Sequence, residues 1–144
     1  MTLQAVRAHF EDPIRAAAAA LTPPVPVYFD NQQFVEANSP EEFIKMRLDF
    51  GTTTEATLCE NAENLRGSIA LEIFTPKGKG PGRSQRVATD LMKALNTITS
   101  TRHAGKTVRG SVREMTGPNF FALDGRPHFF ARLGCGFQAS YTGP

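Results

Sequence analysis

Tryptophan is absent from this chain, and only two of its 144 residues are cysteines, Cys59 and Cys135. So few cysteines exclude a small domain that several disulfides hold together. Cys135 belongs to an alternating apolar pattern, in which an unpaired cysteine behaves as a small hydrophobic residue. We therefore expect no disulfide between the two cysteines.

Long apolar runs are also missing. No stretch approaches the ~18–20 apolar residues that cross a membrane. The alanine-rich run at residues 16–21 follows Glu11 and Asp12, whereas a secretion signal places basic residues before its apolar part. The net charge of +2 is too small to indicate a nucleic-acid partner by itself. We expect a protein that has no membrane partner and stays in the cytoplasm until it assembles.

Signals of catalysis are equally scarce. The three histidines, His9, His103 and His128, show no metal-ligand spacing. No CxxC or GxSxG motif occurs, and the acidic residues are scattered. The sequence therefore predicts a protein that is not an enzyme and that holds no metal or cofactor.

The strongest pattern that is present runs from Leu65 to Leu95. In its first part, Ile69, Leu71 and Ile73 alternate with other residues, which predicts a strand with one buried face. After a turn rich in glycine and proline, the apolar spacing changes to three and four residues, which predicts an amphipathic helix. That apolar stripe comprises Val87, Leu91, Leu95 and Ile98, with Ala88 and Ala94 beside it. The unit therefore predicts a helix that lies back on a sheet.

The remaining chain continues both patterns. Helical spacing covers residues 3–21, where Pro13 should kink the helix or restart it with Asp12 as a new cap. Alternation predicts strands near residues 44–50, 66–75, 107–113 and 129–141, and a short edge strand at residues 25–29. We expect a single domain over residues 1–144 with an α+β fold, in which two helices pack on one face of a largely antiparallel sheet of about four to five strands.

The turn KGKGPGRS, residues 77–84, stands where phosphate-binding loops are found. Backbone N–H groups at the helix start, helped by Lys77, Lys79 and Arg83, would form an anion cradle. The Walker spacing is absent, however, and Pro81 interrupts the dinucleotide fingerprint. A flexible basic turn, with Pro81 near the first helical position, is the favoured interpretation.

Phe120 and Phe121 stand in the middle of a predicted loop, residues 116–127, which contains Gly-Pro and Asp-Gly turn signals. Two large aromatic residues in such a loop either close over the end of a core or anchor a partner protein. Closure over the core is the leading interpretation.

The run RGSIALEIFTPKGKGPGRSQRVATDLMKAL, residues 66–95, resembles part of the tail terminator (tail completion) proteins of long-tailed bacteriophages. In that family, a strand of the pattern G-x-apolar-x-apolar-x-apolar-x-x-P-x-G-x-G precedes a glycine-proline turn and an amphipathic helix. The corresponding residues here are Gly67, Ile69, Leu71, Ile73, Pro76, Gly78 and Gly80. The alanine-rich helix, the proline break and the segment PVYFDN at residues 26–31 also fit. The resemblance covers most of the chain, from which Pro13 and the long segment 116–127 depart.

This resemblance implies a structural role in the virion tail or neck, without catalysis or a cofactor. Such proteins form a hexameric ring on the end of the finished tail tube, stop its growth and present a surface to the head-side connector. The implied partners are other copies of the chain, the tail tube protein and the head-tail connector. Double-stranded DNA would pass through the ring without specific contact.

We expect the subunit and tube contacts to come from exposed loops. The candidate residues are Lys77, Lys79 and Arg83 in the basic turn, Thr53 in a loop near Thr52–Thr54, and Phe120 with Phe121.

Two alternatives remain open from the sequence. Another connector or completion protein of the neck would have the same general character. A nucleic-acid-binding module would use the outer sheet face, where basic residues outnumber acidic ones: Lys45, Arg47, Arg109, Arg113 and Arg132 against Asp49 and Glu72. Such platforms need several stacking aromatics, and only Phe74 and Phe130 are candidates on that face.

Overall fold

The computed structural model describes residues 3–30, 42–55, 63–78, 80–98, 100–103, 106–122, 125 and 127–142. The elements in these residues follow the order α1 (Leu3–Ala20), β1 (Val27–Tyr28), β2 (Phe43–Glu55), β3 (Glu63–Pro76), α2 (Gly82–Asn96), β4 (Ser100–His103), β5 (Lys106–Ala122) and β6 (His128–Thr142).

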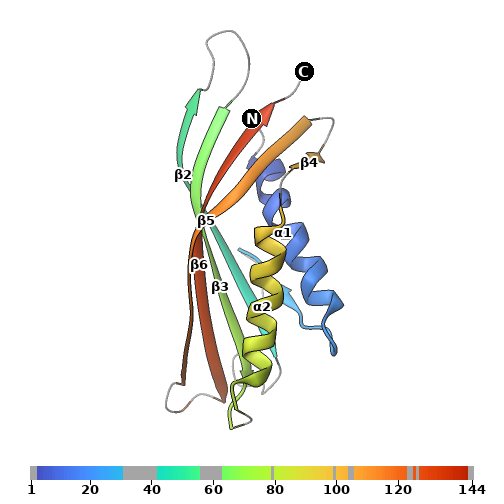
Figure 1. The fold of residues 1–144 in the computed structure, drawn as a ribbon, viewed down its shortest axis with the longest axis vertical. Coiled ribbons are helices and arrows are strands. Elements are labelled where there is room, and N and C mark those ends of the chain that lie inside the picture. The colour runs from blue at the N-terminus through green and yellow to red at the C-terminus, as the bar shows by residue number, and fades with distance from the viewer. Residues whose placement is uncertain are drawn as a thin grey trace.

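The strands form one sheet in the order β1-β2-β3-β6-β5-β4, and both helices lie on the same side of it (Figure 1). The four long strands pair antiparallel, whereas β1 pairs in parallel with β2 over two residues. The predicted α+β class is therefore confirmed, as is the short edge strand near residues 25–29. Six strands are present in the described part because β4 forms within a segment that we predicted to be a polar connection.

The first helix is continuous through Pro13. The predicted restart at Asp12 is wrong, since residues before and after Pro13 belong to one helix and Asp12 instead pairs with Arg15 at 3.0 Å. Proline inside a helix costs about 3 kcal/mol. Burial of one continuous face outweighs that cost, because Phe10 and Ile14 on either side of the proline are fully buried. The expected N-cap, Thr2, lies outside the described residues.

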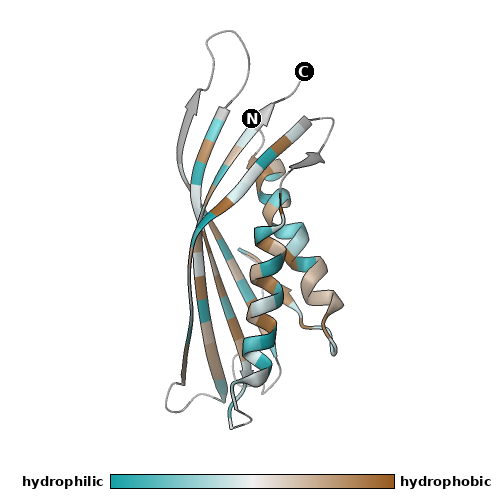
Figure 2. Cartoon of the chain, in the orientation of Figure 1, coloured by the Kyte–Doolittle hydropathy of each residue, from teal (hydrophilic) through white to brown (hydrophobic). Residues whose placement is uncertain are grey.

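The main core fills the space between the helices and the sheet. The alternating residues of β3 and the stripe of α2 meet there, and all five of the following are at most 2% exposed: Ile69, Leu71, Ile73, Leu91 and Leu95. Figure 2 shows the corresponding alternation of apolar and polar residues along the strands. The helix begins at Gly82, one residue after Pro81, which occupies the N-cap position. Both halves of the central strand–turn–helix unit are therefore confirmed.

A second apolar cluster lies on the other face of the sheet, which the sequence had indicated to be polar. The strand register places four phenylalanines in one row across β2, β3, β6 and β5: Phe43, Phe74, Phe130 and Phe121. Phe43 stacks on Phe74 with ring centroids 4.3 Å apart, and Phe121 stacks on Phe130 at 5.3 Å. Their rings cover one another, so Phe74 and Phe130 are each only 6% exposed.

The predicted loop at residues 116–127 is wrong, because β5 continues to Ala122. Its pairing with β6 shifts register twice, between Arg113 and Thr116 and between Thr116 and Asn119. These irregularities absorb the turn signals: Gly117 adopts a left-handed φ of 89°. The adjacent Pro118 removes no ladder hydrogen bond on the outer side, since β4 pairs with β5 only as far as Arg109.

Gly67 provides a test of the sheet packing. A Cβ atom there would meet ring atoms of Phe137 at 2.5 and 2.6 Å and would also collide with the carbonyl oxygen of Asp49. We expect Gly67→Ala to lower the free energy of unfolding in urea by about 1–3 kcal/mol. The control is Gly82→Ala, where nothing lies within 4 Å of the added carbon. Equal stabilities of the two variants would contradict this account of the packing.

His9 predicts a pH dependence of stability. It is 1% exposed, and its Nε2 lies 3.3 Å from the carbonyl oxygen of Gly110. Burial lowers the pKa of His9 below 6.5, and the hydrogen bond to Gly110 opposes this only in part. The folded state therefore binds fewer protons than the unfolded state, so this contribution is complete above about pH 6.5 and is lost as the pH falls toward the folded pKa.

His9→Gln keeps an N–H donor but cannot take up a proton in this range. We expect wild type to lose more stability than His9→Gln when urea denaturation at pH 7 is compared with pH 5.5. Glu11 contributes the opposite sign in both proteins, because burial raises its pKa. Parallel pH profiles of the two proteins would contradict the assignment.

Candidate interaction surface

The basic turn after β3 is exposed at Lys77 and is attached to the start of β6. The backbone N–H of Lys77 donates to the carbonyl oxygen of Pro127 at 2.9 Å. Gly78 and Gly80 adopt φ values of 90° and 77°, which favour glycine. Lys79, the second predicted contact residue of this turn, lies outside the described residues. The turn therefore has a defined backbone at its start and an exposed cationic residue.

Arg83 has a different environment from the one that its position in a basic turn suggested. Its guanidinium pairs with Glu42, with Nη2 3.0 Å from Oε2, and Nε donates to both carboxylate oxygens at 3.1 Å. Nη1 and Nη2 donate to the carbonyl oxygens of Thr22 and Pro23 at 3.1 and 2.7 Å. Arg83 therefore ties the start of α2 to the residue before β2 and to the turn after α1.

Thr53 lies in β2, opposite Leu65 of β3, directly after a register irregularity between Phe50 and Thr53. The expected loop near Thr52–Thr54 is therefore a strand. Backbone pairing with β3 fixes the position of this segment, and it lies on the β2 side of the sheet.

Phe120 and Phe121 cannot act as one aromatic anchor, because consecutive residues of a strand point to opposite faces. Phe120 packs against the main core and stacks on Phe129, with ring centroids 6.0 Å apart. Phe121 packs against the aromatic cluster of the other face, and the guanidinium carbon of Arg132 lies 5.5 Å from its ring centroid. Each ring is thus half-buried in a different apolar cluster.

The basic residues of the helix-free face fall into two groups. Arg47 and Arg132 pair with Asp49 and Glu72, at 3.2 and 3.9 Å. Arg109 and Arg113 are exposed, and neither makes an ion pair with another residue in the described ranges. The aromatic candidates for a nucleic-acid platform, Phe74 and Phe130, are buried in the second cluster. This burial leaves no stacking surface at those two positions.

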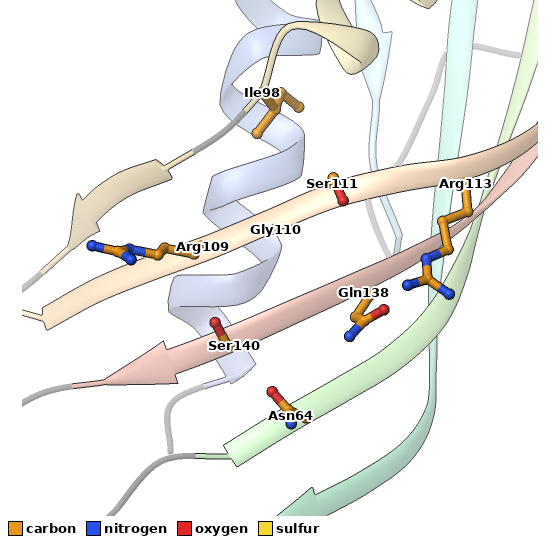
Figure 3. A pocket seen from close by; sticks show the side chains of 8 residues that line it. All are labelled: Asn64, Ile98, Arg109, Gly110, Ser111, Arg113, Gln138 and Ser140. Carbon is orange, nitrogen blue, oxygen red and sulfur yellow. The ribbon is translucent and has the colours of Figure 1, made fainter. Parts of the chain in front are cut away.

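A pocket of about 430 Å³ adjoins these two arginines (Figure 3). Its lining comes from β3, β5, β6 and the turn after α2: Asn64, Ile98, Arg109, Gly110, Ser111, Arg113, Gln138 and Ser140. The Oε1 atom of Gln138 is buried and has no hydrogen-bond partner within the described structure. Sequence reasoning missed this pocket because its walls become neighbours only through the strand order β3-β6-β5.

The described residues offer little for catalysis. They contain no group of three His, Cys, Asp or Glu residues that could hold a metal ion. Cys135 is a free, buried thiol, in agreement with the prediction, and burial raises its pKa to about 11. It therefore stays protonated near neutral pH and is a poor nucleophile; Cys59 lies outside the described residues. Neither α1 nor α2 is both long and apolar enough to cross a membrane.

Comparison with known proteins adds a family to this description. A family profile described as "Phage tail terminator protein" matches residues 3–117. One solved structure is similar over 96% of this chain and 96% of its own, with a TM-score of 0.68 and 20% sequence identity. That likeness concerns the fold. Among curated proteins, none matches this sequence.

The role of Arg83 can be tested by its removal. Arg83 and Glu42 side chains are only 22% and 21% exposed, so Arg83→Ala leaves a partly buried carboxylate and two carbonyl groups without this donor. We expect a loss of about 1–2 kcal/mol in the free energy of unfolding. Arg47→Ala is the control, because that exposed ion pair should contribute less than about 1 kcal/mol. Equal urea midpoints for the two variants would show that Arg83 is not a structural tie.

Proposed function

Because the chain belongs to the phage tail terminator protein family, we propose that it forms a hexameric ring that caps the finished tail tube. It is a structural protein of a phage tail. In the proposed role, the ring stops addition of further tube subunits and offers a surface to the head-side connector. The family match over residues 3–117 is the observation that carries this proposal.

The sheet supports assembly into a ring because its two lateral sides are different. On one side, β1 covers β2 only at Ile44 and Lys45. On the other side, β4 covers β5 only as far as Arg109. A heterologous contact between two different sides of one chain, repeated by rotation, closes a ring. Within the described residues, both sides keep long strand segments that lack an outer neighbour and are available for such a contact.

The proposed mechanism is steric. A ring seated on the tube end occupies the surface to which the next tube subunit would bind, and its opposite face receives the connector. Double-stranded DNA passes through the opening without sequence-specific contact, and no covalent step or cofactor takes part. The exposed start of the turn at Lys77 is a candidate tube contact, with Arg83 holding the adjoining helix in place. Assembly takes place in the host cytoplasm.

The proposal predicts a measurable effect on tube length. Purified tail tube protein should polymerise to long tubes alone, and the addition of this protein should arrest growth, with one ring on the tube end in electron micrographs. Light scattering of the protein, alone and mixed with tubes, should give the mass of six copies in the ring form. Unchanged growth together with absence from tube ends would overturn the proposal. So would binding to heads alone, which indicates a different neck protein.

A further inference from the structure

The pocket on the helix-free face has the character of an anion site. Arg109 and Arg113 stand two positions on either side of Ser111 along β5, so their side chains leave the same face of the sheet. Residues two apart on a strand are separated by about 7 Å, a spacing that allows both guanidinium groups to bind one acidic segment. Arg66, in the row of Ser111 and Gln138, is also exposed on this face.

Gln138 limits what the anion can be. Its buried Oε1 atom lacks a hydrogen-bond donor in the described structure, and an unmet acceptor of this kind costs about 1–3 kcal/mol. A ligand that fits must therefore offer carboxylates or another anion to the arginines and an N–H group to Gln138. A polypeptide segment rich in glutamate or aspartate has both. The phosphate backbone of DNA offers acceptors only.

The chain itself contains such a segment. Residues 55–63, EATLCENAE, contain three glutamates and no lysine or arginine. Glu55 and Glu63 are directly opposite in the register of β2 and β3. Like charges at directly opposite positions destabilise a strand pair. A cationic partner would remove that destabilisation.

The sheet register places the acidic and basic groups at the same height on different sides. Glu63 pairs with Tyr141 of β6, and Tyr141 pairs with Val108 of β5, the residue next to Arg109. Glu55 ends the β2 side of this row, whereas Arg109 and Arg113 lie on the β5 side. Rotation about an axis along the strands therefore brings the acidic end of one copy to the basic pocket of the next.

We propose that the pocket at Arg109, Arg113 and Gln138 receives the acidic segment 55–63 of the adjacent copy and so closes the ring. This inference rests on the proposed ring. The contact is heterologous: each copy gives its segment to one neighbour and its pocket to the other. Six such contacts neutralise the exposed arginines without any other partner.

Charge reversal tests this contact. Arg109→Glu with Arg113→Glu should raise the protein concentration needed for half-assembly at least about tenfold. Glu55→Arg with Glu63→Arg should do the same. The matched control is Arg86→Glu with Lys93→Glu, which changes the net charge equally at exposed positions of α2 and should leave assembly unchanged. Circular dichroism and thermal melting establish that each variant is folded.

Recombination of the changes decides the pairing. A chain with all four substitutions in the pocket and the segment should assemble again. A mixture of the pocket variant and the segment variant should also assemble, because alternating copies restore every acidic–basic contact. Assembly of the pocket variant at wild-type concentration, disruption by the α2 control, or failure of both rescues would overturn this contact while the ring stands. Wild type that never forms rings, even on tubes, would overturn the proposed function as well.

Discussion

The antiparallel pairing of β3 with β6 is the constraint on which the rest of the structure depends. Every residue of β3, from Glu63 to Pro76, has a register partner in β6, and β2 and β5 attach on either side of this pair. The period of two then decides the two faces together. One face supplies the aliphatic surface that α1 and α2 cover. The other receives the aromatic row at one end and the polar pocket at the other.

The two faces are closed by different physical means. Helices bury the side chains of Ile69, Leu71 and Ile73 by adding a layer. On the opposite face no helix is present in the described structure, and the aromatic row buries itself, because planar rings at neighbouring register positions stack across the strands. That row is confined to the end of the sheet near His128, which packs edge-on against Phe43 at 5.2 Å. The rest of the face stays polar and open to partners.

Local patterns in the sequence predicted most of the fold, because alternation and helical spacing are properties of neighbouring residues. Ile69, Leu71, Ile73 and the stripe of α2 are buried as expected. The errors have a common cause. Gly117 and Pro118 signal a turn locally, yet a strand at the side of a sheet can absorb them as an irregularity. The bonds of Arg83 to Glu42 and Thr22, and the pocket at Gln138, join residues far apart in the sequence, so no local pattern could indicate them.

Charge separation connects this architecture to assembly. A net charge of +2 suggested a nearly neutral protein, but that number hides two groups of opposite sign at the same height of the sheet. Closed rings require two different complementary surfaces on each chain, since a surface that binds only its own kind gives a dimer. Net charge reports neither surface. The register of β2, β3, β6 and β5 does, because it places segment 55–63 on one side and Arg109 with Arg113 on the other. A sheet with such unlike sides is suited to contacts that continue around a ring.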